Sequence, residues 1–419
     1  MTYDWLIVGG GIVGLSLAKT IRKDLPNDSI LILDKEQAPG VHASGRNSGV
    51  LHAGIYYKPG SLKARLCSTG SKMMKAYCQE HNLPLQQWGK VIVPTSGVDD
   101  PGLDRLYEYA LEGGAQIQQL DGASLREIEP AISPHLERGL YSPATAVVDP
   151  IAVVKHLVRE LEQKGVDFAW GEEVHNIDAA RKKVFTTSGV KDYGHLINCA
   201  GAHADKIAKR CGVGEDYHIL PFKGIYYQLS PESPIKLTGN IYPVPDLAVP
   251  FLGVHFTKGV HGKVYVGPTA LPAFGREHYQ GVQGVSLSDT LRVITTIASQ
   301  YTQNINGFRP LMHQELPKLT KSGFYQAAKA LVPELKIEHL LPSQKVGIRA
   351  QLFHSAKQEL VMDFAVEKGP DSTHILNAVS PAFTSGFSFA DYVWSELITK
   401  AKAEPILKVS SQGSRQASI

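Results

Sequence analysis

The chain has 419 residues and a formal net charge of +3 at pH 7, and 43% of its residues are hydrophobic while 20% are charged. This composition allows a large buried core and excludes a disordered chain, and the near balance of charge excludes nucleic acid as the main partner. The four cysteines form no CxxC pair, and so few thiols in a chain of this length predict a reducing compartment, so we expect a cytoplasmic location.

The chain opens with the pattern of a β-α-β unit over residues 4–36. A short apolar strand is predicted at 6–8, and a helix with apolar residues four apart is predicted at 12–23. A second buried strand follows at 30–33. This order of elements is typical of the start of a dinucleotide-binding fold.

The turn between the first strand and the helix fits the GxGxxG pattern with Gly9, Gly11 and Gly14. The first glycine permits the tight turn, the second lets a pyrophosphate approach the backbone, and the third allows close helix–strand packing. Asp34 ends the second strand, where a carboxylate can accept hydrogen bonds from ribose hydroxyls, and Lys35 follows it. These residues predict an adenine dinucleotide without a 2′-phosphate.

A glycine- and serine-rich connection over residues 37–60 comes next. A loop of this length in a compact protein is usually functional. Its small residues allow close approach to a cofactor, and Arg46, Asn47 and Ser48 supply donors for a phosphate or for the edge of a flavin ring. A flexible linker is the plain alternative.

Helices and strands alternate through the next part of the chain. Periodicity and capping residues predict helices at 61–80, 102–111 and 150–164 and strands at 90–94, 174–177, 183–187 and 190–198. The last of these strands ends in a turn of small residues, Ala200 and Gly201, which we expect to lie beneath the cofactor. An ordinary connection to the next helix is the plain alternative.

The remainder of the chain changes character. Residues 216–275 are rich in strands, 285–336 look mostly helical, and 345–395 return to strands and end in a helix from about Phe387.

The start of that last helix is a candidate cofactor contact. Thr384, Ser385 and Gly386 are predicted to place free backbone N–H groups at its N-terminus, where they would stabilise negative charge on a reduced flavin. The plain alternative is a capped surface helix.

Four longer segments of unusual sequence carry a resemblance to a known family: Arg46–Gly60, Gly239–Asp246, Pro250–Thr257 and Val346–Gln351. Through them, the chain to about residue 400 resembles the D-amino-acid-oxidase-type FAD oxidoreductases and, within them, the L-2-hydroxyglutarate oxidases/dehydrogenases. The resemblance implies FAD as the cofactor, a two-domain fold, and oxidation of L-2-hydroxyglutarate to 2-oxoglutarate.

The chain departs from the family pattern at three positions. Val379 stands where the family usually has proline, Phe383 stands where it usually has alanine, and Lys223 stands where arginine is common. These departures leave the exact hydroxy acid less well defined than the cofactor.

The expected fold class is α/β (α+β overall), with a Rossmann-like FAD-binding domain and an inserted antiparallel-sheet substrate domain. The FAD-binding domain is expected to be discontinuous, over 1–88, 145–215 and 340–405. The substrate domain is expected over 89–144 and 216–339, followed by a mobile tail at 406–419.

Oxidation of a 2-hydroxy acid requires a base for the hydroxyl proton and a C–H bond held toward the flavin. His255, in an apolar strand-like stretch of a matching segment, is the first candidate for the base. His52, in the cofactor loop, is the second. Related dehydrogenases tether FAD through a histidine in a similar setting, but a noncovalent role near the ring is favoured. For His255 the alternative is a satisfied core or surface histidine.

A five-carbon diacid also needs fixed donors for its carboxylates. Arg349 is the strongest candidate, because a guanidinium matches a carboxylate with two parallel hydrogen bonds. Its alternative is an internal salt bridge. Tyr57, Lys58 and Tyr242 are weaker candidates for the distal carboxylate.

Two other functions fit parts of this pattern: an FAD-dependent amine or amino-acid oxidase, and a non-catalytic dinucleotide-binding protein. Oxygen, a quinone or a soluble carrier would each serve as electron acceptor. No apolar run approaches the ~18 residues of a membrane span, so only a peripheral association with the inner face of a membrane is left open. We expect no metal site.

Overall fold

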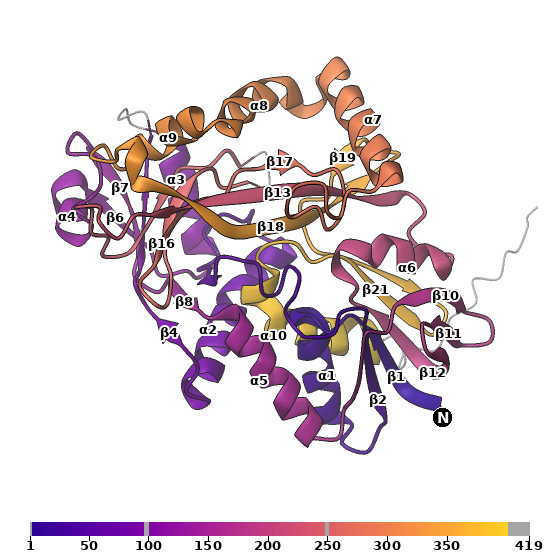
Figure 1. Cartoon of the computed structure of the whole chain (residues 1–419). Helices are drawn as coiled ribbons and strands as arrows, with labels where there is room; N and C mark the ends of the chain where they lie inside the picture. The colour runs from indigo at the N-terminus through magenta and orange to yellow at the C-terminus, as the bar shows by residue number, and fades with distance from the viewer. Residues whose placement is uncertain (1, 96–99, 248–250, 401–419) are drawn as a thin grey trace, which may run out of the picture.

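The computed structural model describes residues 2–95, 100–247 and 251–400. Two large sheets lie one above the other in Figure 1, and helices cover their outer sides. The tail predicted at 406–419 lies outside the described residues.

The lower sheet has eight strands and a parallel centre. β1 (Thr2–Val8) pairs in parallel with β2 (Ile30–Asp34) on one side and with β12 (Gly189–Asn198) on the other. These central strands are apolar runs because both faces of the sheet are covered. The other strands are β9 (Asp167–Trp170), β10 (Val174–Asp178), β11 (Lys183–Thr186), β20 (Ala365–Gly369) and β21 (Ser372–Asn377).

The helices on the lower sheet carry the largest core. α1 (Ile12–Asp24), α5 (Pro150–Gln163) and α10 (Ala382–Tyr392) bury their apolar sides against one face. α6 (Ala204–Arg210) covers the other face. The β-α-β unit predicted at the start of the chain is therefore confirmed.

Glycines let α10 lie close to two neighbouring helices. A Cβ at Gly386 would lie 3.0 Å from the Ile12 side chain of α1. A Cβ at Gly70 of α2 (Leu62–Glu80) would lie 2.6 Å from the Ser385 Cα. A larger residue at Gly70 would meet the backbone of α10 and force the two helices apart, whereas at Gly386 the Ile12 side chain would have to shift.

α10 begins at Ala382, so the predicted start near Phe387 was wrong. The residue before the helix is Pro381, and no side chain in the described part of the chain caps the first turn. The usual sequence signal for a helix start is an oxygen-bearing side chain at this position, and it is missing here.

The upper sheet has ten strands and is antiparallel except for one pair. Its longest ladder joins β13 (Tyr217–Leu229) to β18 (Leu340–His354). The exception is the parallel pair of β5 (Lys90–Val93) and β14 (Asn240–Pro243). The other strands are β6 (Gln118–Asp121), β7 (Arg138–Ser142), β15 (His255–Lys258), β16 (Val264–Gly267), β17 (Leu271–Pro272) and β19 (Glu359–Leu360).

Strand β18 belongs to the upper sheet, although residues 340–354 are expected in the FAD-binding domain. Its ladder with β13 is continuous apart from one register shift. The chain then returns to the lower sheet through β20 and β21. We propose that β18 is part of the substrate domain, and the remaining division into domains stays a prediction.

Shorter elements complete the fold. A third sheet contains β3 (Val50–Leu51), β8 (Ala146–Val148) and β4 (Leu85–Gln86). α3 (Pro101–Glu112) and α4 (Gly122–Ile128) lie between β5 and β7 in the sequence. Short helical turns occupy Gly201–His203, Ile305–Gly307, Leu316–Leu319 and Ile337–His339, and a π-helical segment over Val393–Thr399 extends α10.

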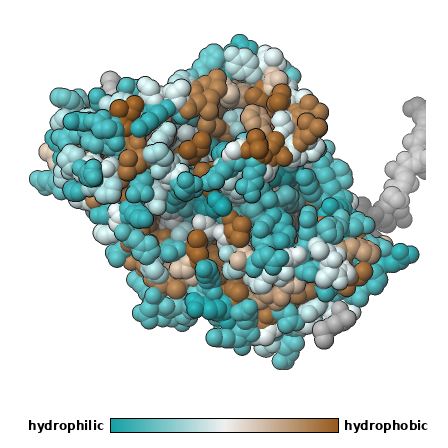
Figure 2. All heavy atoms as spheres, in the orientation of Figure 1, coloured by the Kyte–Doolittle hydropathy of each residue, from teal (hydrophilic) through white to brown (hydrophobic). Residues whose placement is uncertain are grey.

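Helices α7 (Leu287–Gln303), α8 (Phe308–Glu315) and α9 (Lys321–Lys329) cross the top of the upper sheet in Figure 1. Figure 2 shows apolar side chains gathered on the surface in this part of the molecule. Leu287 and Leu291 of α7 are 86% and 62% exposed. Among the residues that the structure describes, no helix has both the length and the apolar character to cross a bilayer.

Candidate active site

A cavity of about 560 Å³ lies between the two sheets, a volume typical of sites for small organic ligands (~300–1,000 Å³). One end is lined by the glycine turn after β1 and by the ends of β2 and β12. The other end is lined by side chains of the upper sheet and by the start of α10. Ligands of open α/β sheets bind beyond the carboxyl ends of the parallel strands, which is where this cavity begins.

The glycine turn has no room for side chains. Gly9 has a φ of +110°, and a Cβ there would lie 2.3 Å from the Cys199 carbonyl oxygen. A Cβ at Gly14 would lie 2.1 Å from the Gly9 carbonyl oxygen. Gly9 and Gly11 line the cavity, whereas Gly14 does not. The turn therefore brings bare backbone and the N-terminus of α1 to the cavity, an arrangement that suits a pyrophosphate.

Asp34 lies against this turn. One of its carboxylate oxygens accepts a hydrogen bond from the Gly10 N–H (2.8 Å), and the other accepts from the Glu36 N–H (2.9 Å). Asp34 and Lys35 both line the cavity. Each carboxylate oxygen accepts more than one hydrogen bond, so Asp34 can hold the turn and still accept from a ribose hydroxyl.

The loop at 37–60 uses several predicted donors to hold its own shape. The Asn47 amide donates to two loop carbonyls, and its oxygen accepts from the N–H two residues further on. The Ser48 hydroxyl accepts from another loop N–H. Arg46 donates to a loop carbonyl (2.6 Å), and its guanidinium lies 4.2 Å from the ring centre of Tyr279. All three line the cavity, as do Ala200 and Gly201 of the turn after β12.

The first turn of α10 reaches the cavity with Ala382, Phe383 and Thr384. The Ser385 N–H already donates to the Pro381 carbonyl (2.9 Å), so the prediction of a free N–H at Ser385 was wrong. The helix starts earlier than predicted, and its unbonded amides therefore come earlier as well.

Ser385 and Gly386 do not line the cavity. They lie where α10 approaches α2 and α1, and they serve packing there. Of the three residues predicted at this helix start, Thr384 alone lines the cavity.

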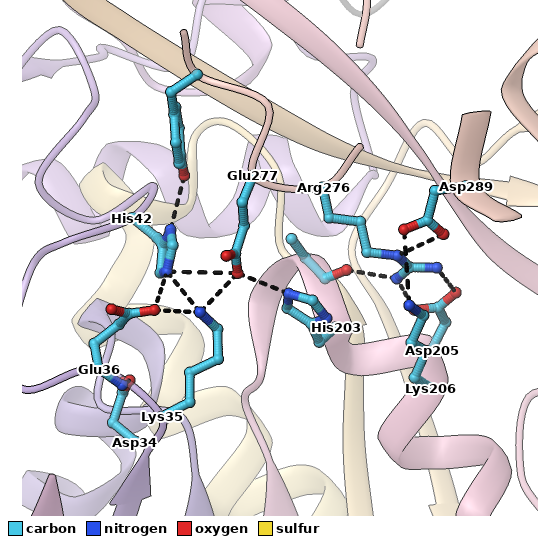
Figure 3. Close-up of polar contacts among 12 residues, drawn as sticks. Asp34, Lys35, Glu36, His42, His203, Asp205, Lys206, Arg276, Glu277 and Asp289 are labelled. Atoms are coloured by element: carbon cyan, nitrogen blue, oxygen red, sulfur yellow. Dashed lines mark hydrogen bonds and ion pairs between the residues drawn. The ribbon is translucent and has the colours of Figure 1, made fainter. Parts of the chain in front are cut away.

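A segment of the upper part crosses onto the cofactor-binding part; we call residues 273–286 the strap. Figure 3 shows Glu277 of the strap pointing toward Lys35, His42 and His203. A Glu277 carboxylate oxygen lies 2.7 Å from Lys35 Nζ and 2.9 Å from His203 Nε2. The hydrogen bond with His203 is the largest of the influences that lower the pKa of Glu277 to about 2. Glu277 is therefore ionised and holds the strap to the lower sheet.

Arg276 anchors the strap a second time. Its guanidinium lies between Asp205 and Asp289 in Figure 3. Arg276 Nη2 is 2.9 Å from an Asp205 oxygen, and Nε is 3.3 Å from an Asp289 oxygen. All three residues are buried, and both Arg276 and Glu277 line the cavity. The strap is thus part of the cavity wall.

His255 lines the other end of the cavity, on β15. Its Nδ1 lies 2.9 Å from the Gly253 carbonyl oxygen. A carbonyl only accepts, so Nδ1 carries the hydrogen and Nε2 keeps its lone pair. The pKa of His255 is lowered to about 3, mainly by burial and also by the charges of Lys90 and Arg349. The hydrogen bond to Gly253 acts in the opposite direction and raises this pKa. The ring stacks on Tyr242 with centroids 3.9 Å apart.

His52 is buried and lines the same cavity. Its Nδ1 has no hydrogen-bond partner within the described ranges. Burial is the main cause that lowers the pKa of His52 to about 3, and Lys90, His255 and Arg349 add to it. A neutral imidazole with an unsatisfied nitrogen at a cavity is suited to contact a ligand.

Arg349 lines the cavity from β18, and its guanidinium lies 5.1 Å from the ring centre of Phe251. Burial lowers the pKa of Arg349, yet a guanidinium stays charged in proteins. Tyr57 interacts electrostatically with Arg349 but does not line the cavity. Lys58 is exposed and does not line it either, so the predicted contact of Lys58 with the distal carboxylate was wrong. Tyr242 and Arg349 remain the candidates that reach the cavity.

The departures from the family pattern differ in their position. Val379 and Phe383 line the cavity, whereas Lys223 does not. Val379 and Phe383, but not Lys223, are therefore expected to alter the shape of the ligand that the cavity accepts.

Sequence reasoning missed several residues of this site. Arg276, Glu277 and Tyr279 come from a segment without a recognisable motif. Lys90 lies behind the cavity, and its one signal is a charge at the start of an apolar run. Such a residue needs a partner or a function, and the sequence shows neither.

Comparisons with known proteins point in one direction. Residues 4–393 match the model of the DAO family, described as FAD dependent oxidoreductase. The L-2-hydroxyglutarate dehydrogenase of Escherichia coli (strain K12) is 34% identical over 400 residues, which cover 95% of this chain and 93% of the relative. The enzyme of the same name from Salmonella houtenae is 36% identical, with 94% and 93% covered. The human mitochondrial L-2-hydroxyglutarate dehydrogenase is 33% identical, with 94% and 89% covered.

Solved structures share the fold at lower identity. L-alpha-glycerophosphate oxidase from Mycoplasma pneumoniae, determined with FAD bound, has a TM-score of 0.73 at 22% identity, with 93% of each chain covered. Glycine oxidase from Geobacillus kaustophilus has a TM-score of 0.67 at 17% identity, with 94% of each chain covered. At these identities the likeness concerns the fold.

Proposed function

Because the chain belongs to the DAO family of FAD dependent oxidoreductases, we propose that it oxidises L-2-hydroxyglutarate to 2-oxoglutarate. The observation that carries this proposal is the 33–36% identity, over nearly the whole chain, to proteins named L-2-hydroxyglutarate dehydrogenase. The cavity supports it with an imidazole acceptor and a guanidinium at the end away from the glycine turn.

The residues present fit an FAD. A Cβ at Gly9 would collide with the neighbouring strand, and the bare backbone there would hold the pyrophosphate beside the start of α1. Asp34 would accept from the ribose, and Thr384 at the first turn of α10 would lie by the flavin ring.

The reaction removes a proton from the hydroxyl oxygen and a hydride from C2, which leaves a C2 carbonyl. Bound FAD supplies the acceptor of the hydride. His255 Nε2 takes the hydroxyl proton, and the bond from Nδ1 to the Gly253 carbonyl keeps that tautomer in place. Arg349 binds a carboxylate and so orients C2. The buried walls keep bulk water from the proton acceptor.

We propose oxygen or a quinone as the acceptor that reoxidises the enzyme, and a cytoplasmic location. Rapid mixing of the reduced enzyme with oxygen or a quinone analogue separates the two acceptors, and cell fractionation tests the location.

Anaerobic mixing of the FAD-loaded enzyme with a panel of acids tests the proposal. L-2-hydroxyglutarate is expected to bleach the flavin absorbance, with 2-oxoglutarate formed in equal amount. Its D-enantiomer, glycine and D-amino acids are expected to bleach it far more slowly. Faster bleaching by an amino acid would replace the proposal with an amine oxidase, and no bleaching by any acid would favour a binding protein.

The ion pairs of Glu277 in the strap are expected to slow the dissociation of FAD. Glu277→Gln keeps the shape of the side chain but removes its charge from Lys35, His42 and His203. These partners are partly exposed, so a loss of ~1 kcal/mol is expected, which corresponds to roughly fivefold faster FAD dissociation. The rise in FAD fluorescence after dilution measures this rate.

Glu160→Gln is the matched control. Glu160 also pairs with two lysines, Lys19 and Lys164, but it lies on α5 and does not line the cavity. Its FAD dissociation is expected to equal that of the parent chain. An equal rate for Glu277→Gln at low salt would mean that the strap does not retain the cofactor.

A further inference from the structure

A buried lysine lies behind the substrate end of the cavity. Lys90 opens β5 and is 1% exposed. Its Nζ has no hydrogen-bond partner among the residues that the structure describes. The ammonium group lies 4.4 Å from the ring centre of Tyr56 and 5.1 Å from that of Tyr242. Aromatic faces offset only part of the cost of burying such a charge.

The aromatic ring of Tyr242 lies between Lys90 and the cavity. Tyr242 lines the cavity and stacks on His255, while Lys90 approaches the same tyrosine ring. The charge of Lys90 also contributes to the lowered pKa values of His52 and His255. Its electrostatic field therefore reaches side chains that line the cavity.

Among the described residues, the groups that face Lys90 provide no negative charge. Burial raises the pKa of the Cys67 thiol on α2 to about 12 and raises the pKa of the Tyr56 and Tyr242 hydroxyls as well, so all three stay neutral at pH 7. The two histidines are neutral or positive, never negative. Burial lowers the pKa of Lys90 itself to about 7, with Cys67 as the opposing influence. An anion bound in the cavity would therefore be the first negative charge to lie near the amine.

We propose that Lys90 is a positioning residue for a dicarboxylate, which it holds from behind Tyr242 and for which it takes up a proton on binding. The inference rests on the proposed function, because that function supplies the dicarboxylate. An anion in the cavity favours the charged amine, and by linkage the charged amine favours the anion by the same factor. Between the pKa values of Lys90 in the free and the bound enzyme, binding consumes a proton and weakens as the pH rises.

The product 2-oxoglutarate is the probe, because it binds the oxidised holoenzyme without turnover. Perturbation of the flavin absorbance gives its Kd from pH 6 to pH 9. Calorimetry in two buffers of different ionisation enthalpy gives the number of protons taken up. We expect the parent enzyme to take up part of a proton near pH 7 and its Kd to rise above that pH.

Lys90→Met keeps the length of the side chain and removes the charge. We expect it to weaken 2-oxoglutarate binding by ~5–150-fold at pH 6, with a difference that shrinks toward pH 9 and with proton uptake lost. Loss of an unpartnered buried charge does not destabilise a fold, so the thermal unfolding temperature is expected to stay the same or rise. A merely structural lysine would show the opposite pattern, a lower unfolding temperature with unchanged proton uptake.

Lys258→Met is the matched control in the same sheet. Lys258 also lies over an aromatic ring, 4.1 Å from that of Trp88, but its ammonium donates to the Leu237 carbonyl (2.9 Å). It does not line the cavity, and its variant is expected to keep the parent's Kd and proton uptake.

The outcomes separate the two claims. No binding of 2-oxoglutarate to the parent enzyme would overturn the proposed function and this inference with it. Binding without proton uptake in the parent enzyme, or uptake that persists in Lys90→Met, would overturn the inference alone. The measurement on the parent enzyme decides even where Lys90→Met fails to fold.

Discussion

His255→Gln is expected to lower the turnover of L-2-hydroxyglutarate by ~10²–10⁴-fold, the usual contribution of a positioned base. Glutamine fills a similar space on β15 and offers hydrogen bonds, but it does not take up a proton at neutral pH. His255 lies on β15 of the upper sheet, whereas the glycine turn follows β1 of the lower sheet, so the FAD content is expected to match that of the parent enzyme. Single-turnover bleaching of the flavin gives the rate, and absorbance of the purified protein gives the FAD content.

The pH dependence follows from the environment of His255. Its pKa in the free enzyme lies near 3, so the neutral, proton-accepting form is present at all pH values well above that. We therefore expect no acid-side loss of kcat/KM near the ordinary imidazole pKa of ~6.5. Carboxylates of the bound substrate would raise the pKa of His255 and make it a stronger base where the reaction occurs.

His261→Gln is the control for this variant. His261 is an exposed histidine near the end of the same hairpin, and it does not line the cavity. The His261→Gln variant is expected to oxidise L-2-hydroxyglutarate at the rate of the parent enzyme. A His255→Gln variant with full FAD and near-normal turnover would contradict the assignment of His255 as the base, and His52 would be examined next.

Local signals in the sequence were enough to predict the β-α-β unit that lines one end of the cavity. The strand, the glycine turn and the helix up to Asp34 are neighbours in the sequence, so periodicity and turn chemistry predict them together. β9 was not predicted, because the strand is only four residues long and partly exposed. It also pairs with β2, which lies in a distant part of the sequence. Such pairing depends on tertiary contacts that no local pattern records.

Other side chains around the cavity were harder to predict for the same reason. A sequence shows that Asn47 carries donors, but not that the loop itself uses them. Lys58 and Tyr57 are neighbours in the sequence, yet Lys58 is exposed while Tyr57 interacts electrostatically with Arg349. Glu277 comes to the cofactor end through the strap, which is far from Lys35 in the sequence. Each of these outcomes is decided by the direction of a side chain in the folded molecule.

Arg349→Met is expected to raise the Kd of 2-oxoglutarate by ~30-fold or more, because removing one partner of a buried charge pair leaves the other unpaired. Arg349→Lys keeps the charge but loses the planar fork, so an intermediate rise of ~10-fold is expected. Arg349 lies 5.1 Å from the Phe251 ring on the cavity wall, and the shorter, more strongly hydrated ammonium of lysine fits this place less well.

The split between KM and kcat tells what the guanidinium does. If it binds substrate and transition state equally, KM rises while kcat changes little, whereas a kcat that falls as well means that it also orients C2 toward the acceptor. Arg309→Lys is the control, since Arg309 is exposed and donates to backbone carbonyls of α7. Equal Kd values for the Arg349 and Arg309 variants would mean that Arg349 does not bind the carboxylate. Tyr242, with Lys90 behind it, would then be the next candidate for the carboxylate site.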